Sequence, residues 1–158
     1  MTREDIKTYS YRISQASKTD LVVITYDIAA DYLKEAKENA ESGDIEGMRS
    51  ALNKVSRVID SLISGLNLEY EIAGNLFQIY LHIKRTLVSV SVSADKDEIT
   101  RIEHLISMLR KSFYSIKDED TSGPLMKNTE QVYQGLTYSN SGYGNESSNV
   151  QANRGYIV

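Results

Sequence analysis

A metal centre of the helical di-iron kind would depend on the two histidines of this 158-residue protein and on their spacing from glutamates. Such a centre requires Glu-x-x-His twice, on facing helices. Here Ile79 stands three residues before His82, and Arg101 stands three residues before His104. The chain has no cysteine, which excludes disulfides, thiolate metal sites and thiol catalysis. The sequence therefore predicts no metal and no cofactor.

His82 leaves one alternative open, because a histidine phosphotransfer module needs a single exposed histidine on a helical scaffold. The residues Ile83-Lys84-Arg85 follow it, and a nearby cation could steady a phosphate. His82 also adjoins the apolar positions Ile79 and Ile83, so we interpret it as a partly buried boundary residue. The serines lack a Gly-x-Ser-x-Gly elbow, and the sequence has no glycine-rich phosphate loop. Nothing in the sequence requires an enzyme.

The overall charge and hydropathy limit the possible partners. A net charge of −4 gives no cationic field that would attract nucleic acid or an anionic membrane. No apolar run approaches the roughly 20 residues needed to span a bilayer. The charged start, Met-Thr-Arg-Glu-Asp, lacks the apolar stretch of a signal peptide. We therefore expect a cytoplasmic protein that binds no nucleic acid and does not insert into membranes.

Apolar residues recur at steps of three and four along the chain, which is typical of amphipathic helices. The first such segment follows Ser17 and Asp20, which resemble a capping box, and ends at Ser42-Gly43-Asp44. Asp44 is placed to cap the second segment, whose end is marked by Gly65. The two apolar stripes contain Leu21, Ile24, Ile28, Tyr32 and Ala36, and then Ile45, Met48, Leu52, Val55, Ile59, Leu62, Ile63 and Leu66.

Two further segments continue this pattern. The third is predicted over about 68–90, and Gly74 inside it favours a close helix contact over simple tolerance of glycine. The run Val88-Ser89-Val90-Ser91-Val92-Ser93 alternates like a strand, but a lone strand would lack a partner, so we predict a frayed helix end. Asp95 and Glu98 form a second capping box for the fourth segment. The two stripes contain Ile72, Leu76, Ile79, Tyr80, Ile83, Leu87 and Val90, and then Ile99, Ile102, Leu105, Leu109 and Phe113.

Composition divides the chain into three regions. Residues 1–16 are polar with scattered aromatics and are interpreted as an N-terminal arm. Residues 17–117 carry the four helical segments, whose short loops predict an antiparallel four-helix bundle in an all-α protein. Residues 118–158 comprise a linker with Pro124, a short extra amphipathic helix and a low-complexity tail expected to be mobile. That helix contains Leu125, Met126, Thr129, Val132, Tyr133 and Leu136.

The apolar stripes are wider than a strict two-in-seven seam, so we expect some apolar surface to remain as a groove. An amphipathic partner helix lying in such a groove is a known mode of recognition. Tyr26 lies on the flank of the first segment and could belong either to the core or to the groove. A helical adaptor for an unspecified partner is consistent with this pattern.

The order and spacing of short apolar and polar pairs resemble the flagellar export chaperone FliS family. The likeness extends from about Tyr9 to Phe113. Lys18 departs from the family's usual proline, Val90-Ser91 from its Ala-Asn, and Phe113 from its tryptophan. The matching pieces are Ile13, Ala16-Ser17, Asp20-Leu21, Tyr26-Asp27, Asp44-Ile45, Leu66-Asn67, Asn75-Leu76, Ile79-Tyr80 and Leu109-Arg110, with Phe113.

The resemblance implies a helical bundle that binds the C-terminal segment of flagellin, prevents its premature polymerisation and delivers it to the flagellar type III export apparatus. It also implies that the N-terminal arm covers part of the groove through Tyr9, Tyr11 and Ile13. The helix formed by Leu125 to Leu136 could dock on the bundle and compete with the partner, or could have no regulatory role. The expected partner-binding residues are Ile13, Leu21, Ile24, Tyr26, Ile28, Leu66, Asn67, Leu76, Ile79, Tyr80 and Ile83.

Overall fold

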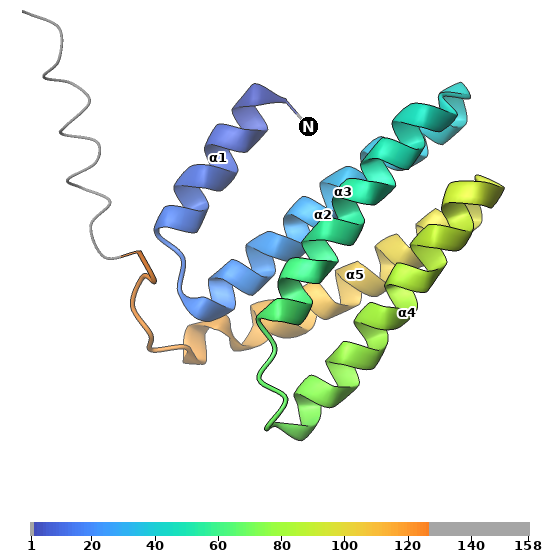
Figure 1. Ribbon diagram of the computed structural model, residues 1–158. Helices are drawn as coiled ribbons and strands as arrows, with labels where there is room; N and C mark the ends of the chain where they lie inside the picture. Colours follow the sequence, from blue (N-terminus) through green and yellow to red (C-terminus); the bar gives the residue numbers. More distant parts are fainter. Residues whose placement is uncertain (1, 127–158) are drawn as a thin grey trace, which may run out of the picture. The chain divides into compact units, whose positions relative to one another are not determined.

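Helices account for all the regular secondary structure in the described part of the computed structural model, residues 2–126. Five α-helices follow one another along the chain, and a short 3₁₀ helix comes after the last (Figure 1). The expectation of an all-helical bundle is confirmed for this part of the chain. The elements are α1 (Arg3–Ser14), α2 (Lys18–Ser42), α3 (Ile45–Ser64), α4 (Glu71–Ser93), α5 (Lys96–Ile116) and η1 (Lys117–Glu119).

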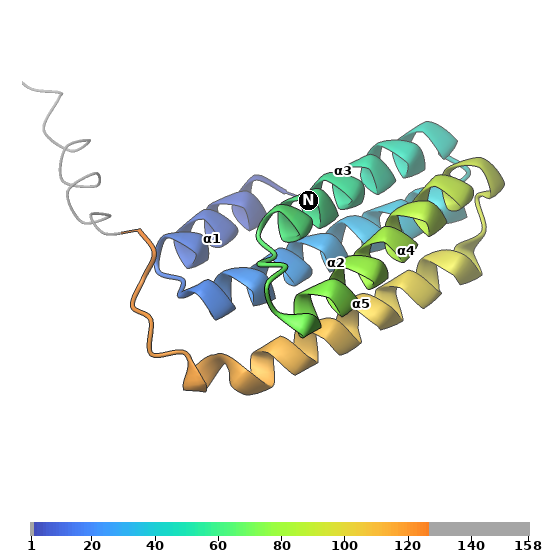
Figure 2. The same ribbon diagram turned by 60° about the horizontal axis from the view of Figure 1, so that its bottom comes forward.

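One apolar core joins α2, α3, α4 and α5, which lie side by side in both views (Figures 1 and 2). The predicted stripes supply much of it, because helical residues three or four apart share a face. Ile28, Ile45 and Ile72 of these stripes lie outside the core, however, and on α2 the core face consists of Tyr26, Ala29, Leu33 and Ala36. Removing these side chains from water is the main favourable term in folding. The core residues without exposed surface include Ala29, Leu33, Ala36, Met48, Ala51, Val55, Ile59, Ile83, Val90 and Ile99.

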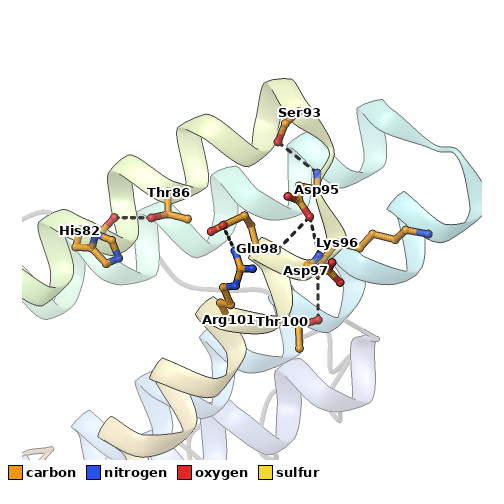
Figure 3. Close-up of polar contacts among 9 residues, drawn as sticks. All are labelled: His82, Thr86, Ser93, Asp95, Lys96, Asp97, Glu98, Thr100 and Arg101. Atoms are coloured by element: carbon orange, nitrogen blue, oxygen red, sulfur yellow. Dashed lines mark hydrogen bonds and ion pairs between the residues drawn. The ribbon is translucent and has the colours of Figure 1, made fainter.

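The predicted caps begin α2, α3 and α5. Ser17 and Asp44 accept hydrogen bonds from the backbone amides of Asp20 and Gly47. Asp95 accepts from the amides of Asp97 and Glu98 (Figure 3). The second capping box is only half formed, however, because the Glu98 carboxylate pairs with Arg101 and the Asp95 amide donates to Ser93.

The alternating run at the end of α4 is helical. Val90 is fully buried beside the core, whereas Val88 is 68% and Val92 is 80% exposed. The helical period, which brings Val90 and Leu87 to one face, therefore prevails over the period of two. The helix continues to Ser93 and ends at Ala94, whose φ is 54° and whose amide donates to Val90.

The N-terminal arm forms α1, a regular helix that the sequence pattern did not reveal. Thr2 and Asp5 make a reciprocal capping box at its start. Polar contacts attach α1 to α2: Arg12 donates to Asp27 at 2.7 Å, and the Tyr9 hydroxyl donates to Asp31 at 2.5 Å. Burial, followed by the Asp31 carboxylate, raises the pKa of Tyr9. Because α1 has no fully buried residue, these polar contacts are central to its attachment.

Asp27 of α2 also contacts α5. It accepts a short hydrogen bond from Arg110 of α5 in addition to the bond from Arg12. The hydrogen bond to Asp27 raises the pKa of Arg110. One half-buried carboxylate thus connects α1, α2 and α5.

The segment after α5 returns to the start of α2. Asp120 accepts from the Thr19 amide at 2.9 Å, in the first turn of α2, and the Leu125 amide donates to the Ala16 carbonyl at 3.1 Å. Leu125 and Met126 are not helical, so a helix does not begin directly after Pro124. The rest of the predicted C-terminal helix and the tail lie outside the described residues.

We expect Asp120→Asn to lower the melting temperature at pH 7. Hydrogen bonds from Ser122 and from the Thr19 amide hold the pKa of Asp120 well below its ordinary value of about 4. The carboxylate therefore contributes stability above about pH 4, and this contribution is lost as the pH falls further. Thermal unfolding should show a constant difference from the wild type between about pH 5 and 7 that shrinks below about pH 4. Asp118→Asn, which removes an exposed carboxylate of the same segment, is the control; an equal difference at pH 3 and pH 7 would contradict the prediction.

Gly74 does not mark a close helix contact, contrary to the interpretation from the sequence. A Cβ atom placed there would meet nothing within 4 Å. Gly74→Ala should therefore raise the free energy of unfolding by about 1 kcal/mol, since glycine is disfavoured in helix interiors. Gly43→Ala should have the opposite effect, because Gly43 ends α2 with a φ of 81°. Urea unfolding of both variants tests this, and a destabilising Gly74→Ala would refute it.

Candidate partner-binding groove

A groove of about 750 Å³ opens at the end of the bundle where α2 and α4 begin and α3 and α5 end. The residues that connect α3 to α4 close one side of it. Its apolar lining comprises Leu21, Val22, Leu62, Leu66, Ile72, Ala73, Leu76, Phe113 and Ile116, with Tyr70 and Tyr80.

No charged side chain lines this groove among the described residues. The polar groups that it does present are the hydroxyls of Thr25, Ser61, Ser112 and Ser115, together with the amide of Asn67. Ile72 at the mouth is 69% exposed, and Tyr70 and Leu68 beside it are similarly exposed. Apolar surface concentrated in this way is typical of a site that binds another chain or an apolar ligand.

The groove exists because α4 and α5 separate. They lie side by side near their connection and diverge toward the start of α4 and the end of α5 (Figure 1). Behind the opening, the Tyr26 and Tyr80 hydroxyls form a buried hydrogen bond. Burial, followed by this hydrogen bond, raises the pKa of Tyr26, and burial raises the pKa of Tyr80. Both side chains therefore stay neutral at physiological pH.

Several predicted binding residues do lie together in the groove lining, namely Leu21, Leu66, Asn67, Leu76 and Tyr80. Others are buried in this structure and do not line the groove. Tyr26 and Ile83 have no exposed surface, and Ile24 is 4% exposed, so none of the three can touch a partner in this structure. Ile13, Ile28 and Ile79 are half-buried and do not line the groove.

Part of the lining was not predicted from the sequence. Phe113 and Ile116 were assigned to the fourth helix, but not to the binding surface, and Tyr70 and Ile72 were not singled out as contacts. A signal for them was present, since alternating helix directions bring the start of α4 and the end of α5 to the same end of the bundle. Which stripe edges remain uncovered depends on how far α4 and α5 diverge.

The N-terminal helix does not cover this groove. Its contacts, Asp27 and Asp31, lie on the α2 face that also carries Asp20 and Ile24, whereas Leu21 and Thr25 line the groove. Within residues 2–126, no residue of α1 contributes to the groove lining. The expectation that Tyr9, Tyr11 and Ile13 cover part of the groove is therefore not supported for this surface.

The surroundings of His82 do not favour phosphate. His82 is exposed and not a boundary residue, and it faces a small hollow of about 80 Å³ that also contains Glu98 and Arg101. Arg101 is paired with Glu98, as Figure 3 shows, and Lys84 is paired with Asp60. Two of the nearby cations are thus paired with carboxylates, and one of these carboxylates, Glu98, lies in the hollow.

Within residues 2–126, no group of three or more histidine, aspartate or glutamate side chains could hold a metal ion. None of the described helices is long and apolar enough to cross a membrane.

Comparisons with known proteins agree with the resemblance in the sequence. The family model described as "Flagellar protein FliS" matches residues 4–120, which include all five α-helices except the first residue of α1. A relative from Salmonella typhimurium named "Flagellar secretion chaperone FliS" is 30% identical over 123 residues, covering 73% of this chain and 91% of the relative. Matches of this extent show that the protein belongs to the FliS family of flagellar secretion chaperones.

Proposed function

We propose that this antiparallel four-helix bundle is a cytoplasmic chaperone that binds the C-terminal segment of flagellin in the groove between α4 and α5. Binding there would prevent premature polymerisation and keep the subunit ready for delivery to the flagellar type III export apparatus. The observation that carries the proposal is an uncharged, apolar groove in a chain that belongs to a family of flagellar secretion chaperones.

The groove favours a partner in helical form where the two chains meet. Apart from the connection between α3 and α4 on one side, its walls are the helices α2, α3, α4 and α5, whose backbone groups are largely bonded within each helix. Such walls offer no free strand edge for β-augmentation. An incoming segment must satisfy its own backbone hydrogen bonds, and an amphipathic helix does so while presenting one apolar face.

The same surface permits reversible binding. Burying about 1,000 Å² of apolar surface contributes roughly 25 kcal/mol of gross free energy at ~25 cal/mol/Å². Ordering the partner and losing its translational freedom offset most of this gain. The remainder can protect the subunit and still allow its release during export.

Two other functions have less support. Histidine phosphotransfer requires a site for the phosphate beside His82, but Lys84 and Arg101 are paired with carboxylates. Phosphorylation of the protein by a phosphodonor, abolished in His82→Ala, would favour that function.

A general helical adaptor would bind an apolar helix unrelated to flagellin as tightly as the flagellin segment.

We expect the wild-type protein to bind a synthetic flagellin C-terminal peptide and Leu76→Asp to weaken that binding at least ~10-fold. The new carboxylate would have to lose its water on entering an apolar site. Val88→Asp, on the exposed side of the same helix, is the matched control and should bind like the wild type. Isothermal titration calorimetry measures all three affinities.

The proposal would fail if the wild type did not bind the peptide. It would also fail if both aspartate variants bound it equally, because the contact surface would then lie outside the groove. Circular dichroism should establish that both variants remain helical before their affinities are compared.

A further inference from the structure

Tyr26 contacts both walls of the groove although it exposes none of its own surface. Its hydroxyl is hydrogen-bonded to that of Tyr80 on α4. Its ring packs against Phe113 of α5, with the centroids 5.7 Å apart and the planes tilted by 49°. Tyr80 and Phe113 line the groove, whereas Tyr26 lies behind them on α2.

The position of Tyr26 between α4 and α5 affects the groove because these two helices diverge. Toward the groove, α4 and α5 move apart (Figure 1), so their spacing there depends on what is packed behind them. A hydrogen bond between two hydroxyls requires a narrow range of distances and angles, so it limits how far Tyr80 can move from α2. The ring contact places Phe113 relative to the same side chain.

We propose that Tyr26 is a positioning residue that sets the width of the groove by holding Tyr80 on one wall and Phe113 on the other. It acts on a bound partner only through these two neighbours. The identity of that partner rests on the proposed function, but the width of the groove can be tested without any partner.

Two substitutions separate this role from a contribution to stability alone. Tyr26→Phe keeps the ring contact but leaves the Tyr80 hydroxyl, on a side chain that is 1% exposed, without its partner. A buried hydroxyl left unpaired is costly, whereas removing both partners is often nearly neutral. The double variant Tyr26→Phe/Tyr80→Phe should therefore regain most of the melting temperature that the single variant loses. It still lacks the link between α2 and α4.

The first experiment measures the groove of the free protein by methyl NMR. In the double variant, the methyl signals of Leu76, Ile72 and Ile116, which line the groove, should shift. Signals of Leu33 and Ile99, which are core residues outside the groove lining, should stay in place. Unchanged signals from the groove residues would overturn the inference whether or not flagellin binds.

The second experiment measures the affinity for the synthetic flagellin C-terminal peptide by calorimetry, well below the melting temperature of each variant. We expect the double variant to bind roughly 2- to 10-fold more weakly, the change that corresponds to one ordinary hydrogen bond. Tyr32→Phe, which removes a hydroxyl from the same helix outside the groove, should bind like the wild type.

The two experiments fail in different ways. If the double variant regained its stability and also bound the peptide like the wild type, Tyr26 would have a structural role only. If the wild type itself did not bind the peptide, the proposed function would fall, while the methyl signals would still decide whether Tyr26 sets the width of the groove.

Discussion

Burial of one face of α2 underlies the rest of this structure. Ala29, Leu33 and Ala36 have no exposed surface, and small side chains such as these alanines let neighbouring helices approach closely. Because α2 contributes to the core, to the groove and to the attachment of α1, a shift of α2 would disturb all three. Caps at Ser17 and Gly43 define both ends of this helix.

Different kinds of interaction occupy the other faces of α2. Toward α1, charged and hydroxyl groups dominate, with Asp27 accepting from Arg12 and Asp31 accepting from Tyr9. Asp27 also accepts from Arg110 of α5. Toward the groove, Leu21 and Val22 present apolar side chains. Polar contacts at half-exposed sites contribute little net stability, since water competes for the same groups. The α1 contact is therefore weaker than the packing of the core.

The sequence predicted the bundle helices well, because their formation depends on local patterns. Periodic apolar residues located α2 to α5, and Ser17, Asp44 and Asp95 marked where three of them begin. Helix α1 was missed as a helix because it has no apolar stripe and owes its position to contacts with residues distant in the sequence, such as Asp27 and Asp31. Its capping pair, Thr2 and Asp5, was a local signal that could have been used.

The groove was only partly predictable for a related reason. Periodicity identifies an apolar face but not how much of it the neighbouring helices cover. Tyr26 and Leu76 both lie on such faces, yet Tyr26 is fully buried and Leu76 lines the opening. The difference arises from the divergence of α4 and α5 and from the Tyr26–Tyr80 pair, and neither follows from spacing along the chain.

The closed helical walls of the groove have a consequence for aggregation. Exposed strand edges recruit other extended chains and promote fibrous assembly. In the proposed complex, a client segment in this groove would meet mainly side chains and no strand edge, so its apolar residues would be shielded without a template for cross-β growth. A holding protein built in this way can keep an assembly-prone chain soluble without nucleating a different insoluble form.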